Sequence, residues 1–115
     1  MRIHIDGAGF NGEDCAYCIK YSNKKPILKI IYENHNSIYM ETLCLLKCLE
    51  DCPDKSKIYS DCQILVGYIN YNWITHIEEL KPMIEKIKGL LTEKKCKLIS
   101  FIVYENCYCR SYVSL

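Results

Sequence analysis

The sequence predicts an α/β domain in which a mixed sheet of five strands is flanked by helices. Three features lead to this prediction. Three strand-like segments follow one another in the first 32 residues, separated only by short turns. Helix-like and strand-like segments then alternate, as in strands joined by helical crossovers. No linker, repeat or low-complexity segment divides the chain, so residues 1–115 are expected to fold as a single domain.

The three opening strands are expected over residues 2–6, 15–21 and 27–32, as an antiparallel meander. In the first of them, isoleucines alternate with polar residues, which is typical of a half-buried strand. A glycine-rich break follows it, and the turn SNKKP separates the other two strands.

Helices and strands alternate along the rest of the chain. A helix is expected after the loop ENHNS, because Asn36 or Ser37 can cap it and leucines recur along it. The predicted elements are a helix over residues 38–52, a strand over 57–60, a short helix over 62–69 and a last strand over 97–104.

A long helix is predicted over residues 73–91, where apolar residues recur at spacings of three and four. Pro82 lies in the middle of this segment. Because proline disrupts the interior of a helix, the helix is expected either to kink there or to begin nearer Glu79. Trp73 is expected to pack in or near the core at the head of this helix.

Composition and charge argue against a membrane protein and against a strongly basic nucleic-acid-binding protein. A net charge of +1 gives no overall attraction to nucleic acid, so any such binding would depend on a local lysine patch. No apolar run approaches the ~20 residues of a membrane helix, and the N-terminus has no run of the signal-peptide type. We therefore expect a cytoplasmic monomer without membrane association.

The chain has nine cysteines, a high and odd number. With no export signal, they are expected to be reduced and without a disulfide-linked partner. Three of them share one helical stripe and are predicted to be buried thiols: Cys44, Cys48 and Cys52. A zinc site is an alternative for four others, although the usual knuckle glycines are missing. Its ligands would be Cys15, Cys18, Cys107 and Cys109.

Three acidic residues occupy marked positions in the predicted fold. Asp6 ends the first strand, Glu41 lies near the start of the first helix, and Asp61 follows the strand over 57–60. Carboxylates are the hard oxygen ligands that Mg²⁺ and Mn²⁺ prefer, and two such ions can hold and cleave a phosphodiester. Each acid alone is more often a surface group, so an incidental origin stays open as an alternative.

The motifs around these acids resemble those of the ribonuclease H family. IHIDGAGFNG is similar to the first strand of that family, METLCLLKCLE to its glutamate-bearing helix, and IYSDCQ to the strand and helix that carry its next aspartate. The resemblance covers nearly the whole chain. It implies an RNase H-like fold of the compact kind that lacks a basic handle.

The resemblance also implies an activity and a set of site residues. The activity is that of a two-metal endonuclease that cuts the RNA strand of an RNA–DNA hybrid with Mg²⁺ or Mn²⁺. Asp6, Glu41 and Asp61 would be the catalytic metal ligands. The positions implied for substrate binding are Gly9, Asn11, Gly12 and Ser37.

The chain departs from the family at the fourth acid. The family's last aspartate falls on Ser111, and Glu105 is the nearest acid, some residues early. Two functions therefore remain open. One is an active nuclease with three acids and a substitute at the fourth position. The other is a catalytically degenerate RNase H-like domain that acts as a nucleic-acid-binding or structural module.

Overall fold

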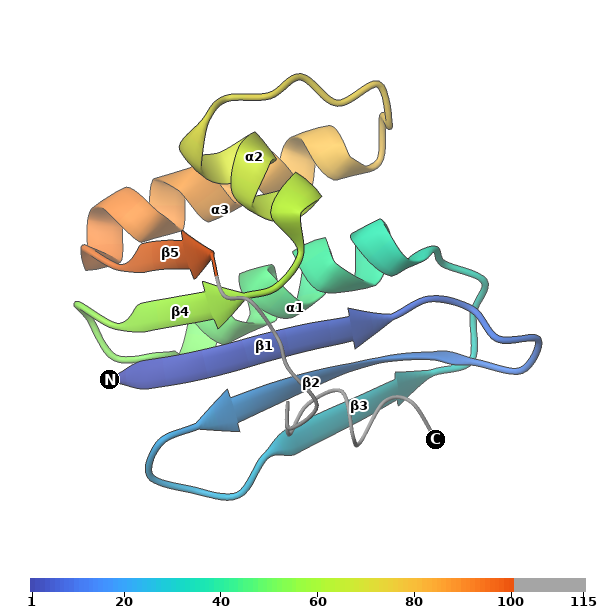
Figure 1. The fold of residues 1–115 in the computed structure, drawn as a ribbon, viewed down its shortest axis with the longest axis horizontal. Coiled ribbons are helices and arrows are strands. Elements are labelled where there is room, and N and C mark those ends of the chain that lie inside the picture. The colour runs from blue at the N-terminus through green and yellow to red at the C-terminus, as the bar shows by residue number, and fades with distance from the viewer. Residues whose placement is uncertain (101–115) are drawn as a thin grey trace.

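A five-stranded mixed sheet forms the centre of the structure, a computed structural model that describes residues 1–100 (Figure 1). Three helices accompany the sheet within these residues. In chain order, the elements are β1 (Arg2–Ala8), β2 (Cys15–Tyr21), β3 (Ile27–Ile31), α1 (Ser37–Asp51), β4 (Lys57–Ser60), α2 (Gln63–Asn70), α3 (Leu80–Lys94) and β5 (Lys97–Ser100).

The strand order is β3-β2-β1-β4-β5. β1 to β3 form an antiparallel meander, whereas β4 and β5 run parallel to β1. The predicted mixed sheet with three antiparallel opening strands is therefore confirmed. The last strand, predicted over residues 97–104, is present over Lys97–Ser100, and the other residues of that prediction lie outside the described part.

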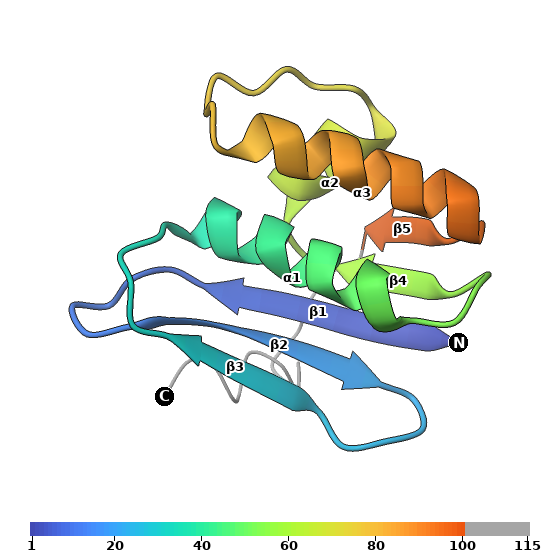
Figure 2. The ribbon, with the colours of Figure 1, turned by 180° about the vertical axis from the view of Figure 1, so that it is seen from behind.

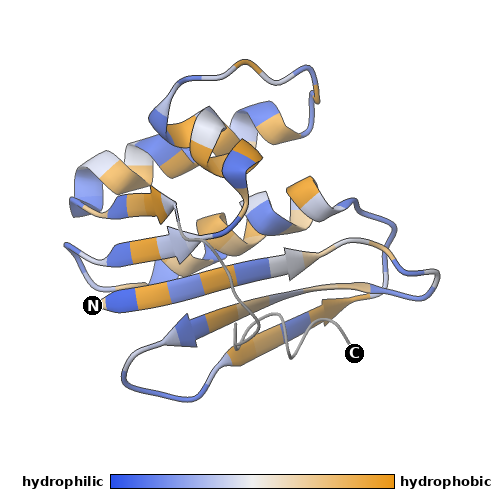
Figure 3. Ribbon diagram, viewed as in Figure 1, coloured by the Kyte–Doolittle hydropathy of each residue, from blue (hydrophilic) through white to orange (hydrophobic). Residues whose placement is uncertain are grey.

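Helix α1 covers one face of the sheet, over β1 and β2, and packs against α3 (Figure 2). Helix α2 lies beside β4 and β5. Apolar and polar residues alternate along β1 (Figure 3), and the alternation places Ile3 and Ile5 in the core with Leu45 and Leu49 of α1. Within residues 1–100, no helix combines the length and apolar character needed to cross a membrane.

Helix α3 begins at Leu80, so the predicted helix over residues 73–91 is wrong in its first turns. The later start, near Glu79, is the prediction that the structure confirms. Pro82 then falls in the first turn of the helix, where a missing N–H costs no hydrogen bond. Lys95 ends the helix in a left-handed conformation, with φ of 57°.

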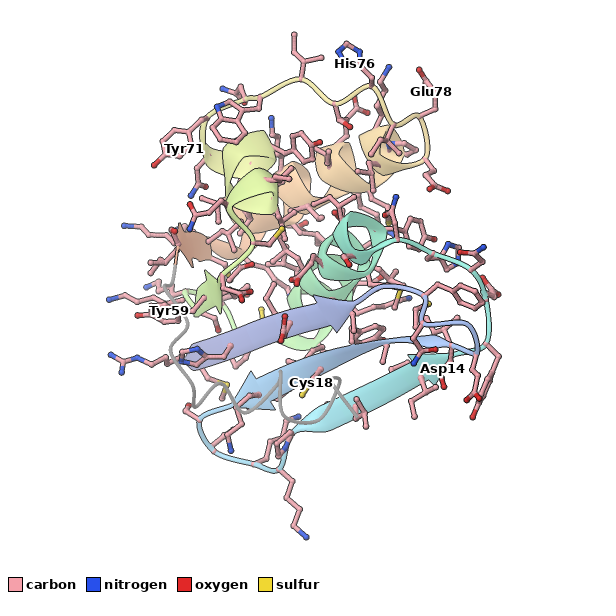
Figure 4. The ribbon with its side chains drawn as sticks, turned by 45° about the vertical axis from the view of Figure 1, so that its right-hand side comes forward. Asp14, Cys18, Tyr59, Tyr71, His76 and Glu78 are labelled. Carbon is pink, nitrogen blue, oxygen red and sulfur yellow. The ribbon has the colours of Figure 1, made fainter. Side chains whose placement is uncertain are left out.

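The segment before α3 is a loop on the outside of the molecule. Figure 4 shows Tyr71, His76 and Glu78 pointing outward along it. Trp73 lies in this loop and is 53% exposed, so the prediction that it anchors the head of the long helix is wrong. Its ring lies directly over Gly67 of α2, where a side chain would collide with it.

Seven cysteines lie in residues 1–100, and all seven are free thiols. Six are buried and Cys62 is half-buried, so the prediction that the thiols are mostly buried is confirmed for the described residues. Of the alternative zinc ligands, Cys107 and Cys109 lie outside the described residues. Cys15 and Cys18 are both buried in β2.

Candidate metal centre

Asp6 and Asp61 come together because their strands are parallel neighbours. The ladder between β1 and β4 ends at the pair Ile5 and Ser60. Each aspartate follows directly after its member of that pair, so both carboxylates lie where the two strands stop pairing. Neighbouring strands thus place together two acids that are far apart in sequence.

Glu41 reaches the same place because α1 passes very close to the end of β1. A Cβ atom on Gly7 would lie 2.7 Å from the backbone nitrogen of Glu41 and 2.8 Å from the carbonyl carbon of Met40. Such distances are too short for any side chain. Glycine after Asp6 is therefore what allows the helix to bring its glutamate against the strand. Gly7 was predicted to lie in a turn, whereas it lies within β1, and a close backbone approach leaves no periodic signal in a sequence.

Potential ligand atoms of Asp6, Glu41 and Asp61 all lie within 4.8 Å of one another. Asp6 is 1% exposed and Glu41 5%, while Asp61 is half-buried and open to solvent. Within residues 1–100, this is the only group of three or more such side chains with metal-binding geometry. The three predicted catalytic residues are thus brought together.

Local contacts fit this group to a divalent cation. The backbone N–H of Gly7 donates to Asp6 Oδ1 at 3.0 Å. Among the described residues, Glu41 Oε2 is buried and accepts no hydrogen bond. A buried carboxylate oxygen without a donor is costly, and a hard cation such as Mg²⁺ or Mn²⁺ would satisfy it. The donor set, three carboxylates, matches what these ions prefer.

The crowding of carboxylates changes the titration of Glu41. The pKa of Glu41 is raised to about 9, mainly because the carboxyl group is buried. Repulsion by Asp6 and the hydrogen bond between the two carboxyl groups also raise it, and Asp61 makes a smaller contribution. The N–H of Gly7 acts in the opposite direction. Without a cation, Glu41 therefore holds a proton at neutral pH. A bound cation would have to displace that proton.

Two of the positions predicted to bind substrate, Gly9 and Ser37, lie together at the N-terminus of α1. A Cβ on Gly9 would lie 2.7 Å from the backbone nitrogen of Ser37, so these two positions are in close contact. Asn11 Oδ1 accepts hydrogen bonds from the N–H groups of Glu13 and Asp14, which closes a turn. Gly12 has a φ of 104°, which favours glycine.

The loop that contains these residues is joined to the segment before α1. The N–H of Phe10 donates to the carbonyl of His35 at 2.8 Å. The side chain of Asn36 accepts from the N–H of Tyr39 at 2.9 Å, so Asn36 is the cap of α1. The loop after β1 is therefore joined, at Gly9 and Phe10, to the segment that begins α1. Ser111 and Glu105, considered for the fourth position, lie outside the described residues.

Comparison with solved structures identifies the fold. The RNase H1 of Halobacterium salinarum NRC-1 aligns with a TM-score of 0.71 and 16% identity, over 88% of this chain and 84% of that one. LC11-RNase H1, solved in complex with an RNA/DNA hybrid, aligns with a TM-score of 0.72 and 16% identity, over 98% and 93%. The N-terminal RNase H domain of Mycobacterium tuberculosis Rv2228c, solved as a fusion with maltose-binding protein, aligns with a TM-score of 0.73 and 14% identity, over 98% and 91%.

These alignments show that the chain has the ribonuclease H fold, as its motifs predicted. The sequence matches no protein-family model and no curated protein. At 14–16% identity these alignments show the fold but not the activity, so the function has to be inferred from the residues of the site.

Proposed function

We propose that this protein is a divalent-metal-dependent nuclease that cuts the RNA strand of RNA–DNA hybrids. The observation that carries the proposal is the cluster of Asp6, Glu41 and Asp61, with ligand atoms within 4.8 Å of one another. The ribonuclease H fold supports the same class, and one structure of that fold was solved with an RNA/DNA hybrid. Mg²⁺ or Mn²⁺ bound here would activate a water and stabilise the leaving oxygen of the phosphodiester.

The residues of the chain divide the remaining work. Asp6 is the most buried of the three acids and is held by the N–H of Gly7, so it fixes the position of the site. Asp61 is more open and faces the solvent from which substrate arrives. Glu41 supplies a carboxylate whose proton leaves on metal binding. The loop at Gly9–Gly12, with Ser37, would lie along the RNA strand.

Cleavage of a labelled hybrid tests this proposal. With millimolar Mn²⁺, the wild-type protein is expected to cut the RNA strand, and Asp61→Asn to lose at least a hundredfold in rate, since a metal ligand is removed. Asp54→Asn is the matched control, because Asp54 is exposed on the turn before β4 and should leave the rate unchanged. An intact RNA strand after incubation with well-folded wild-type protein would contradict the proposal.

The absence of a fourth acid favours a second function, a degenerate domain that binds nucleic acid without cutting it. Ser111 takes the position of that acid in the sequence. If Ser111 replaces a ligand, the second metal binds weakly and activity is low and favours Mn²⁺ over Mg²⁺. Ser111→Asp should then raise the cleavage rate. Hybrid binding with no cleavage in either form would favour the binding module.

A further inference from the structure

Two thiols meet where the end of α1 contacts the turn between α3 and β5. Cys52 Sγ and Cys96 Sγ lie 3.8 Å apart, although the residues are 44 positions apart in sequence. Cys52 is 4% exposed and Cys96 7%, so both lie just beneath the surface. A third thiol, Cys48, is hydrogen-bonded to Cys52 from one helical turn earlier.

Both sulfurs are held at fixed helix ends. Cys52 is the C-cap of α1, and its N–H donates to the carbonyl of Cys48 at 2.9 Å. Cys96 follows the left-handed Lys95 at the end of α3, and its N–H donates to the carbonyl of Leu91 at 3.0 Å. The approach of the two sulfurs is therefore a product of backbone positions that packing and hydrogen bonds define.

A lysine lies beside one member of the pair. Lys94 Nζ donates to the carbonyl oxygens of Leu49 at 2.6 Å and Cys52 at 2.8 Å. Hydrogen bonds from Cys48 and Cys96, together with the charge of Lys94, lower the pKa of Cys52 to about 6, against the opposing effect of burial. Burial raises the pKa of Cys96. The pair thus combines a thiol whose pKa is lowered with one whose pKa is raised, and a lowered pKa favours reaction with oxidants.

We infer that Cys52 and Cys96 form a reversible disulfide when the protein meets a peroxide. The Cys52 sulfur attacks one peroxide oxygen, the O–O bond breaks, and Cys52 becomes a sulfenic acid as the first water leaves. The Cys96 sulfur then attacks the Cys52 sulfur, the S–O bond breaks, and a second water leaves. Two thiols lose two electrons and two protons, and one hydrogen peroxide becomes two waters.

Geometry favours Cys96 over Cys48 as the partner of Cys52. Residues four apart on a helix have Cβ atoms about 5–6 Å apart, whereas a disulfide needs about 3.5–4.5 Å. A bond to Cys48 would therefore deform α1. A bond to Cys96 needs the sulfurs to approach by about 1.7 Å, which side-chain rotation can supply. This bond would connect α1, which bears Glu41 near its start, to the turn before β5.

The test is a thiol count on the full-length protein before and after treatment with one equivalent of hydrogen peroxide. Counted after unfolding, free thiols should fall from nine to seven, return to nine with dithiothreitol, and peptide mapping should find a Cys52–Cys96 link. The closed loop should raise the melting temperature by on the order of 10 °C. A link between any other cysteines, or a loss of no thiols, would overturn the inference.

Variants separate the two chemical steps. Cys96→Ser should lose only one thiol, with a dimedone-reactive sulfenic acid at Cys52, and Cys52→Ser should lose none. Cys62→Ser is the control, since Cys62 is half-buried and outside the cluster, and it should behave as wild type. Peptide mapping of the wild type stands even where a variant fails to fold. No readout depends on hybrid cleavage, so this inference and the proposed function fail separately.

Discussion

At the scale of single residues, Glu41 carries a large electrostatic cost in the proposed metal site. It is 5% exposed, lies against Asp6 and has a pKa raised to about 9. An unfolded glutamate has a pKa near 4.3. Between these two values the folded protein binds a proton on Glu41 that the unfolded chain has released. The crowded carboxylates therefore destabilise the metal-free fold, and a bound cation would relieve that cost.

The stability of the metal-free protein should consequently fall as pH rises. More protons are bound in the folded state between about pH 5 and 9, so raising the pH favours unfolding in that window. From pH 6 to 8 the free energy of unfolding should drop by about 2–3 kcal/mol, at ~1.4 kcal/mol for each pH unit. Urea unfolding at several pH values, followed by circular dichroism, measures this slope.

Glu41→Gln should remove most of that slope, because the amide is neutral in both states. Between pH 6 and 8, the difference in unfolding free energy between the variant and the wild type should therefore grow by about 2–3 kcal/mol in the absence of metal. Glu85→Gln, at an exposed position of α3, is the matched control and should keep the wild-type slope. A wild-type protein with equal stability at pH 6 and 8 would show that Glu41 ionises normally.

At the scale of elements, the contact between β1 and α1 positions the site. Gly7→Ala should force α1 away from β1, because the new methyl group would meet backbone atoms of Glu41 and Met40. We expect the free energy of unfolding to fall by about 1–3 kcal/mol. The rate of hybrid cleavage should fall by more than the loss of folded protein alone would explain. Thermal unfolding and cleavage rates on the same preparation measure the two effects.

Gly89→Ala provides the control for that substitution. Gly89 is an exposed position within α3, and a Cβ there meets nothing within 4 Å. Alanine should stabilise the helix by about 0.5–1 kcal/mol and leave cleavage unchanged. If Gly7→Ala proves as benign as Gly89→Ala, the close approach of α1 does not position the site.

The contact between α2 and the following loop offers another test. The ring of Trp73 packs on Gly67, and the backbone N–H of Trp73 donates to the Gly67 carbonyl at 3.1 Å. Gly67→Ala should displace the indole into solvent, with a red shift of its fluorescence. Since this chain has one tryptophan, the signal is unambiguous. An unchanged emission spectrum would contradict the packing of Trp73 on α2.

At the scale of the whole molecule, most of the fold and the core of the site could be predicted from the sequence. The three acids were predicted as a set that could meet around a cation, and Asp6, Glu41 and Asp61 do lie together. The parallel pairing of β1 with β4 was not predicted, and β1 continues to Ala8, beyond the strand end expected at Asp6. The start of α3 was ambiguous, since apolar periodicity continued through Trp73 and Ile77 and only Pro82 argued against a helix there. Local patterns cannot show contacts between distant residues.

Two such contacts escaped prediction. In the sequence, Gly7 cannot be distinguished from a glycine in a turn. Only the structure shows that it contacts the backbone of α1. Cys52 was assigned to a stripe of buried thiols on one helix, and nothing in the sequence indicated that Cys96 would lie 3.8 Å from it. Both features depend on how α1 packs on the rest of the molecule, which is a property of the assembled fold.

The proposed metal site can be tested by calorimetric titration of Mn²⁺ into the metal-free protein at pH 7.5, in two buffers of different ionisation enthalpy. Mn²⁺ should bind with release of about one proton per ion, because the cation displaces the proton of Glu41. Asp61→Asn should weaken the binding severely, whereas Asp54→Asn should not. Absence of binding at millimolar Mn²⁺, or equal binding by wild type and Asp61→Asn, would contradict a metal site at Asp6, Glu41 and Asp61.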